Sequence, residues 1–145
     1  MAAKKVRVEV KQGSGFRTEC RVGKHIVIID QPVAAGGTDE GPTPLDYQMV
    51  ALGGCIVAIG RIIARQRNLT IRGFDVLVEG ELDTDRLMGK AQDKRAGFSS
   101  ITAHVKIDSD LSPEEQKKFL HEIDERCPIS ENLQNATQVS ITLAA

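Results

Sequence analysis

The sequence predicts an α+β fold, organised as one domain over residues 1–145. Three patterns predict this class. Apolar and charged residues alternate in the first 30 positions, an uncharged apolar stretch occupies the middle, and a capped amphipathic helix lies near the end. The expected order of elements is β-β-β-α-β-β-α-β, with sheets wrapped around a central apolar helix. A chain of this length buries roughly 70% of the surface of its unfolded form, which is enough for a core without disulfides.

The first 30 residues are expected to form an antiparallel meander of three strands. Val6, Val8 and Val10 alternate with charged residues, which is the period of a half-buried strand. The same alternation predicts a second strand over residues 16–22, and an apolar run predicts a third over residues 25–30. Glycine-containing turns separate the three strands. The residues that follow, rich in Gly and Pro, are expected to form a loop up to the next helix.

A long helix is expected from Thr43 or Pro44 to about Arg67. Thr43 suits the N-cap, Pro44 suits the first helical position, and Asp46 complements the positive end of the helix dipole. Residues 49–60 carry no charge, so the helix is predicted to be buried on all sides. In a chain this short, a helix of that kind needs cover from a wrapped sheet or from a second subunit.

Two more strands are expected after this helix, over residues 70–82 and 98–107. Each shows mixed or alternating apolar positions, and the intervening residues 83–97 are polar and read as a loop. These two strands would supply the second half of the sheet structure.

The last part of the chain is expected to hold a second helix, a short helix and a closing strand. A capping-box pattern that starts at Ser112 marks the beginning of the second helix. Pro128 disfavours its continuation, so Cys127 is predicted at or just past its end. A short helix over residues 130–135 and a strand over residues 138–143 are expected to follow.

Composition and charge exclude several classes of function. The chain has 19 Lys and Arg against 20 Asp and Glu, and only 3% aromatic residues, so it lacks the basic patches and stacking platforms of nucleic-acid binding. No run approaches the ~18 apolar residues of a membrane span, and the N-terminus lacks a secretory pattern. His25, His104 and His121 have no metal-ligand spacing. A cytoplasmic enzyme or small binding protein remains, with no metal, nucleic acid or membrane partner expected.

The chain has three cysteines, Cys20, Cys55 and Cys127, none in a C-x-x-C pair. An odd number in a reducing compartment argues against structural disulfides, and burial without reactivity is the common state of a free cysteine. Cys20 alternates with apolar neighbours and is expected to pack in a sheet. Cys55 lies in the uncharged helix, too far from its N-terminus to be activated by it, so a reactive Cys55 needs a charged partner from another segment.

Three segments resemble the OsmC/Ohr family, in its broader OsmC-like branch. They are Gly41-Pro42-Thr43-Pro44-Leu45-Asp46, Ala51-Leu52-Gly53-Gly54-Cys55 and Cys127-Pro128-Ile129-Ser130. The resemblance extends from about residue 6 to residue 143, and the predicted order of elements agrees with the fold of that family. It implies an intertwined homodimer with its two sites at the subunit interface.

The resemblance also implies an activity and its residues. Members of the family are thiol peroxidases with a preference for organic hydroperoxides. By the match, Cys55 is the peroxidatic cysteine, which becomes a sulfenic acid, and Cys127 is the resolving cysteine, which condenses with it to a disulfide. No bound cofactor is implied, and an external dithiol of the dihydrolipoamide type restores both thiols.

The sequence departs from the family where the peroxidatic thiolate is activated. In the OsmC and Ohr branches a Glu follows the Pro that precedes the cysteine by eleven residues, and that Glu holds an Arg over the thiolate. Here Leu45 takes that position and Asp46 comes next. Arg17 is the candidate activating cation, Asp46 is the candidate acidic partner, and Arg61 lies nearly two helical turns beyond Cys55.

Two other interpretations stay open from the sequence. The chain could be a catalytically weak or non-enzymatic dimer of the same fold that binds a small apolar ligand, with the cysteines as part of the lining. Alternatively, Cys55 and Cys127 could be unconnected residues of the core, which a large distance between their sulfur atoms would support.

Overall fold

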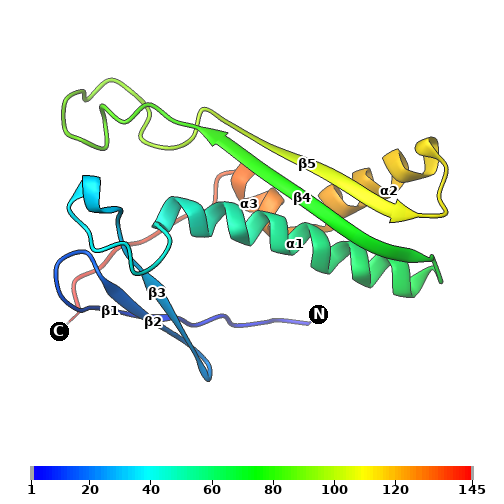
Figure 1. Ribbon diagram of the computed structural model, residues 1–145, viewed down its shortest axis with the longest axis horizontal. Coiled ribbons are helices and arrows are strands. Elements are labelled where there is room, and N and C mark those ends of the chain that lie inside the picture. The colour runs from blue at the N-terminus through cyan, green and yellow to red at the C-terminus, as the bar shows by residue number, and fades with distance from the viewer. Residues whose placement is uncertain (1, 145) are drawn as a thin grey trace. The chain divides into compact units, whose positions relative to one another are not determined.

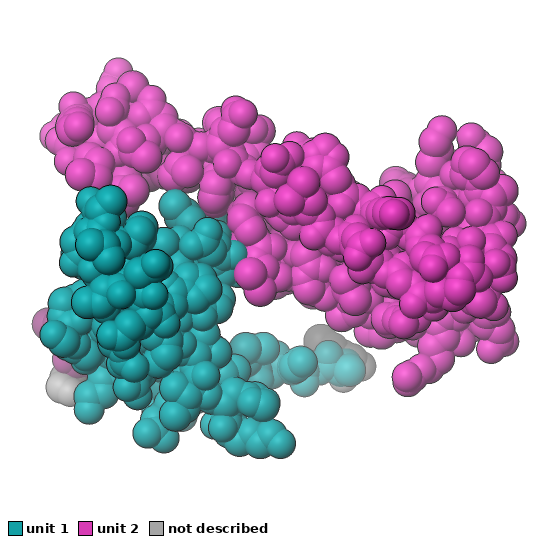
Figure 2. All heavy atoms as spheres, in the orientation of Figure 1, with its two compact units in different colours: residues 1–48 teal, residues 49–145 magenta. Residues whose placement is uncertain are grey.

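The computed structural model describes residues 2–144 and confirms the α+β class. These residues form two compact units, one within residues 1–48 and the other within residues 49–145 (Figure 2). Along the chain, three strands and a short 3-10 turn precede a long helix, which two strands and two further helices follow (Figure 1). The expected single domain over the whole chain stays a prediction.

The first unit contains the predicted meander, with β1 (Glu9–Gln12), β2 (Thr18–Val22) and β3 (His25–Ile29) side by side in that order. Cys20 on β2 is buried between Val10 and Val27 of the neighbouring strands, the packing position that its alternation predicts. The expected start of the first strand at Val6 is wrong. The first paired residue of β1 lies next to the tight turn between β2 and β3, so residues 6–8 extend past the end of the sheet.

A buried carboxylate orders the loop that follows β3. Asp30 is 1% exposed and accepts hydrogen bonds from the backbone N–H groups of Gln31, Thr38 and Glu40 and from the Thr38 hydroxyl. The Thr38 hydroxyl, followed by these N–H groups, lowers the pKa of Asp30 to about 2. A loop rich in Gly and Pro thereby acquires a fixed path, with one 3-10 turn at Val33–Ala35.

The long helix α1 spans Pro44–Gln66, close to the predicted limits. At its start, the Thr43 N–H and hydroxyl donate to Asp46 at 2.8 and 2.6 Å, and the Asp46 N–H donates back to the Thr43 hydroxyl at 3.2 Å. This reciprocal arrangement is a capping box with Asp in place of Glu. Beyond the helix, Asn68 adopts a left-handed conformation with φ of 52°, which turns the chain.

The second unit builds its core between one sheet and three helices. β4 (Ile71–Glu81) and β5 (Ser100–Ser109) form a long antiparallel pair, and α2 (Pro113–Arg126) and α3 (Pro128–Gln134) follow it. The core residues come from α1, from the sheet and from α2: Leu52, Ile56, Ile63, Ala64, Ile71, Ile107, Phe119 and Ile123. This unit contains the apolar core and both cysteines of the family resemblance, Cys55 and Cys127, so it positions the candidate site.

Gly60 sets the closest approach of α1 to its neighbours. A Cβ at this position would lie 2.6 Å from Phe74 Cζ and 3.2 Å from Ile123 Cδ1. Phe74 is itself stacked on Phe119, with ring centroids 6.1 Å apart. The absence of a side chain at Gly60 therefore lets the helix, the β4 strand and α2 meet at one point.

The burial of α1 on all sides is not realised in the single chain. Its buried residues lie toward the core, whereas Val50 and Ile62 are 62% and 46% exposed. The expectation that no segment suits a membrane span also needs correction, since α1 has 23 residues and a mean hydropathy of 1.6 over its most apolar window. A helix that packs in the core of a globular protein can be as apolar as a membrane-spanning helix. The buried residues of α1 belong to such a core.

The strand predicted over residues 138–143 is absent from the described structure. The segment has no regular secondary structure and pairs with no strand, and Val139, Ile141 and Leu143 are between 79% and 100% exposed. Alternation makes a segment suitable for a strand, but a strand forms only where an unpaired edge is within reach. The short helix predicted over residues 130–135 is confirmed and begins two residues earlier, at Pro128.

Candidate active site

Cys127 forms the joint between α2 and α3. Its backbone is extended, with φ of −82° and ψ of 110°, because the following residue is Pro128. It is at once the C-cap of α2 and the N-cap of α3, where its Sγ accepts the Ser130 N–H at 3.4 Å. The side chain is 0% exposed. The prediction that Cys127 ends the second helix is therefore confirmed.

The fold brings Cys55 to Cys127. Cys55 is half-buried on α1 and packs against the core cluster that contains Cys127, and it lies close enough to the Cys127 thiol and to the Ile129 backbone N–H for both to shift its pKa. Both cysteines are free, so the pair is present in its reduced form. The two thiols thus lie near each other inside one unit, which argues against the interpretation of unconnected core cysteines.

The environment of Cys55 favours its protonated form. Burial is the main cause that raises the pKa of the Cys55 thiol, and the hydrogen bond and charge of Cys127 raise it further. The Ile129 N–H acts in the opposite direction. Because a thiolate and not a thiol is nucleophilic, a reactive Cys55 requires a cation that lowers this pKa.

Arg17, the candidate cation, is held by two carboxylates within the first unit. Its guanidinium donates to Glu40 at 2.5 Å and to Glu19 at 3.1 Å, and these bonds raise its pKa. The Glu40 backbone N–H in turn donates to the buried Asp30. The Arg17 side chain is therefore fixed by acidic neighbours that the sequence motif does not contain.

Asp46, the candidate acidic partner, caps α1. Both of its contacts are to Thr43, whose hydroxyl and N–H lower the pKa of the Asp46 carboxyl. It lies nine residues before Cys55 on the helix, more than two turns away. Arg61 donates to the Ile71 carbonyl at 2.7 Å and so anchors the start of β4.

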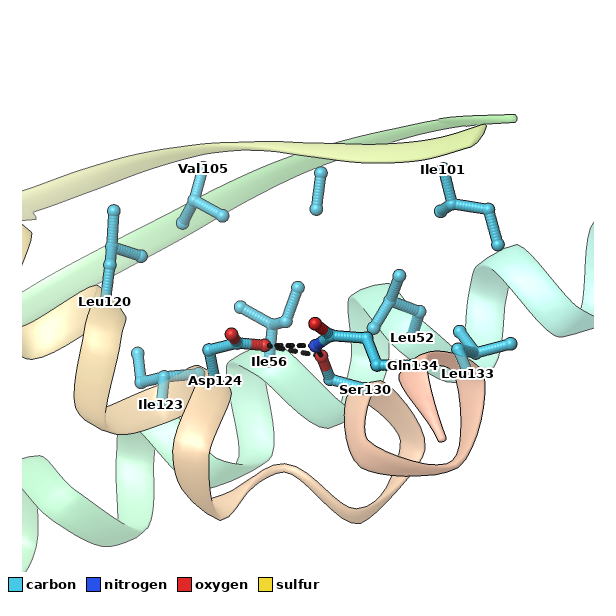
Figure 3. A pocket seen from close by; sticks show the side chains of 11 residues that line it. Leu52, Ile56, Ile101, Val105, Leu120, Ile123, Asp124, Ser130, Leu133 and Gln134 are labelled. Atoms are coloured by element: carbon cyan, nitrogen blue, oxygen red, sulfur yellow. Dashed lines mark hydrogen bonds between the residues drawn. The ribbon is translucent and has the colours of Figure 1, made fainter. Parts of the chain in front are cut away.

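A pocket of about 410 Å³ lies in the second unit, and neither Cys55 nor Cys127 belongs to its lining (Figure 3). Its apolar walls come from α1, β5, α2 and α3: Leu52, Ile56, Ile101, Ala103, Val105, Leu120, Ile123 and Leu133. A polar cluster of Asp124, Ser130 and Gln134 completes the lining. The Ser130 hydroxyl donates to Asp124 at 2.5 Å, and the Gln134 side-chain amide donates to Ser130 at 2.8 Å and to Asp124 at 3.2 Å.

Sequence reasoning missed this polar cluster. Ser130 lies in the Cys-Pro-Ile-Ser segment, and its spacing of four to Gln134 places the two on one face of a short helix. No signal marks Asp124, because it belongs to the preceding helix and faces the cluster only after the chain turns at Cys127. Ser130 connects the two features, since its N–H contacts the Cys127 sulfur and its hydroxyl lies in the pocket.

Comparison with known proteins places the chain in a family. Residues 37–142 match the family described as OsmC-like protein. A hydroperoxide reductase from Mycoplasma pneumoniae is 28% identical over 106 residues, which cover 73% of this chain and 72% of that protein.

Solved structures agree with the fold. An OsmC-like protein from Mycoplasma pneumoniae has a TM-score of 0.81 at 24% identity, with 93% of this chain and 91% of that chain covered. An organic hydroperoxide resistance protein OsmC from Legionella pneumophila has a TM-score of 0.69 at 18% identity, with 92% of both chains covered. With the family match over most of its length, the chain belongs to the OsmC-like protein family.

Proposed function

We propose that this chain is a cytoplasmic thiol peroxidase that reduces organic hydroperoxides with Cys55 and Cys127. The observation that carries the proposal is the proximity of the two thiols, which come from α1 and from the joint of α2 and α3. The family and the hydroperoxide reductase relative support a role in hydroperoxide chemistry. The proximity of the two thiols supports Cys55 and Cys127 as the reacting pair.

The proposed reaction has three steps. The Cys55 thiolate attacks the terminal oxygen of the hydroperoxide, an S–O bond forms, the O–O bond breaks, and the alkoxide takes a proton and leaves as an alcohol. The Cys127 thiol then attacks the Cys55 sulfenic acid, an S–S bond forms, and water leaves. An external dithiol of the dihydrolipoamide type reduces the disulfide and becomes a disulfide itself. No bound cofactor takes part.

Arg17 is the proposed activating cation. A cation is required because burial and Cys127 both raise the pKa of Cys55. Arg17 suits this task because Glu19 and Glu40 fix its guanidinium, although they also offset part of its charge. Arg17→Ala is expected to raise the pH midpoint of Cys55 alkylation. Arg7→Ala is the control, because Arg7 is exposed and pairs with Glu9, and it is expected to leave the midpoint unchanged. An unchanged midpoint in Arg17→Ala removes Arg17 from the mechanism.

Asp46, which caps α1 through Thr43, keeps a proposed supporting role at the site.

The proposed active form is a homodimer. The exposed side chains of Val50 and Ile62 form an apolar face on α1. The segments near the two ends of the chain also expose apolar residues, among them Val6, Ile141 and Leu143. A second copy supplies apolar cover for these surfaces. Light scattering at micromolar concentration is expected to give twice the chain mass of 15.8 kDa. A monodisperse monomer contradicts the proposal.

The test of the peroxidase uses one equivalent of cumene hydroperoxide on the reduced protein, with oxidised cysteines mapped by mass spectrometry. A rapid Cys55–Cys127 disulfide is the expected product, and Cys20→Ser serves as the matched control that keeps both reacting thiols. Cys127→Ser is expected to stop at a Cys55 sulfenic acid, which dimedone traps. Slow, unselective oxidation contradicts the proposal and favours the alternative, a non-enzymatic dimer that binds a small apolar ligand in the pocket of the second unit.

A further inference from the structure

We propose that the loop between β3 and α1 belongs to the part of the protein that activates the thiol: Glu40 positions the Arg17 guanidinium, and the buried Asp30 carboxylate holds Glu40 in place. The inference deepens the proposed function and rests on it for one point, that Arg17 is the cation that activates Cys55. Arg17, Glu40 and Asp30 all lie within the first unit.

The Arg17 side chain has two carboxylate partners, which constrain it differently. Its Nε–H donates to Glu40 at 2.5 Å, and its Nη1–H donates to Glu19 at 3.1 Å. Glu19 is only two residues beyond Arg17, so their bond ties the guanidinium to its own strand. Glu40 is 23 residues away, and its bond joins the guanidinium to the loop that runs into α1 (Figure 1). Glu40 is therefore the partner that fixes where the guanidinium points.

A tight turn fixes the backbone from which the Arg17 side chain extends. The Gly13 N–H donates to the Arg17 carbonyl at 2.8 Å, and the Arg17 N–H donates to the Ser14 carbonyl at 3.1 Å. The turn passes through Gly15, whose φ of 61° costs a glycine no strain. The freedom left to Arg17 lies in its side-chain torsions, and the ion pair with Glu40 restricts these.

Asp30 holds the backbone of Glu40. Its Oδ2 accepts the Glu40 N–H at 3.1 Å, and it also accepts the N–H and the hydroxyl of Thr38 at 3.3 and 2.6 Å. The Asp30 side chain is buried, so these donors replace the water that a carboxylate otherwise binds. Gly37 keeps the loop close to its start, since a Cβ there would lie 1.9 Å from the Gln31 carbonyl oxygen. The loop thus presents Glu40 from a fixed point of the backbone.

Glu40 has two opposing effects on Arg17. It fixes the guanidinium, and its negative charge offsets part of the positive charge that lowers a thiol pKa. When the charge of Glu40 is removed, loss of position raises the pH midpoint of Cys55 alkylation, whereas loss of the offset lowers it. The Glu40 side chain is 52% exposed, so water screens its charge, and the positional effect is expected to dominate.

The first measurement follows Arg17 itself, through the NMR signal of its Nε–H group in the reduced protein. The signal is assigned by its loss in Arg17→Lys. Glu40→Gln keeps the side-chain length and loses the charge, and it is expected to make this Nε–H exchange with water at least about threefold faster. Glu9→Gln is the matched control, because it removes the carboxylate of the exposed Arg7 pair, and it is expected to leave the exchange unchanged. Unchanged exchange in Glu40→Gln overturns the proposal.

Thr38→Val tests the part that Asp30 plays without removing the buried carboxylate. It keeps the β-branched shape and deletes the hydroxyl that makes the shortest bond to Asp30. The Arg17 Nε–H is expected to exchange faster than in the wild type but more slowly than in Glu40→Gln. An exchange rate equal to that of the wild type overturns the role of Asp30.

The second measurement is the pH dependence of Cys55 alkylation, read by mass spectrometry. Glu40→Gln is expected to raise the midpoint and to slow alkylation at pH 7 by about threefold or more. The double variant Arg17→Ala/Glu40→Gln is expected to match Arg17→Ala, because Glu40 acts through Arg17. A midpoint lowered by Glu40→Gln, or effects that add in the double variant, overturn the proposal.

The two measurements separate this inference from the proposed function. If Arg17→Ala raises the midpoint and Glu40→Gln does not, Arg17 remains the activating cation and the role of the loop falls. If Glu40→Gln frees the Arg17 Nε–H but Arg17→Ala leaves the midpoint unchanged, the activating role of Arg17 falls, and the loop has no part in the chemistry of Cys55.

Discussion

Replacing Gly60 with alanine tests the packing that places Cys55 in the core. The new Cβ would lie 2.6 Å from Phe74 Cζ and 3.2 Å from Ile123 Cδ1, so the Phe74 ring must move. The ring cannot move freely, because it is stacked on Phe119. We therefore expect Gly60→Ala to destabilise the protein, even though alanine is the better helix former.

The magnitude follows from three effects. Overpacking a core costs about 1–3 kcal/mol, and disturbing an aromatic pair costs about 0.5–1.5 kcal/mol. Alanine in place of glycine inside a helix raises the free energy of unfolding by about 1 kcal/mol. The expected net loss is about 1–3 kcal/mol, a sizeable part of a typical total of about 5–15 kcal/mol.

The assay is urea unfolding followed by circular dichroism at one fixed protein concentration, since association would shift the apparent stability. Gly54→Ala is the matched control on the same helix, because a Cβ there meets nothing within 4 Å in the single chain. It is expected to stabilise by up to about 1 kcal/mol. A Gly60→Ala variant as stable as the wild type refutes the packing argument. A destabilised Gly54→Ala would instead indicate a second chain against that face.

Three further outcomes follow from local contacts. Ser112→Ala removes the capping box of α2, in which the Ser112 hydroxyl accepts the Glu115 N–H and the Glu115 carboxylate accepts the Ser112 N–H. The stability measured by thermal unfolding is expected to fall by about 1 kcal/mol, and an unchanged stability would show that the cap does not stabilise α2. Asp30 has a pKa lowered to about 2, so its contribution is full above the ordinary value near 4 and declines as pH falls toward 2. Asp30→Asn is expected to flatten that part of the acid-unfolding profile, and an identical profile would contradict the sign. Cys127→Ala is expected to lower the pH midpoint of Cys55 alkylation, because Cys127 raises the pKa of its partner, and a higher midpoint would reverse this assignment.

Local signals predicted most of the fold. The helix of Pro44–Gln66 and the capped helix from Pro113 carry their own start and stop residues, so their limits are readable within a residue or two. The errors lie where pairing depends on distant residues. The segment 138–143 has the alternation of a strand, but alternation does not specify a partner, and the segment pairs with neither described sheet.

The candidate site was predictable only in part. The resemblance selected Cys55 and Cys127, while their contact depends on how α1 packs against the turn before Pro128, which no spacing in the sequence specifies. The partners of Arg17 were hidden for the same reason, since Glu40 reaches it only because Asp30 fixes the intervening loop. Asp124 carries no sequence signal at all.

The position of Cys127 between two helices has a kinetic consequence. Its sulfur lies near Cys55 within one unit, so in the proposed cycle disulfide formation is intramolecular and has a high effective molarity, independent of protein concentration. Further oxidation of a sulfenic acid to a sulfinic acid needs a second peroxide molecule from solution. In the proposed cycle, the fraction of sulfenic acid that is oxidised further therefore rises with peroxide concentration and does not depend on protein concentration. By placing Cys127 near Cys55, the joint between α2 and α3 raises the peroxide concentration at which Cys55 would be oxidised to a sulfinic acid.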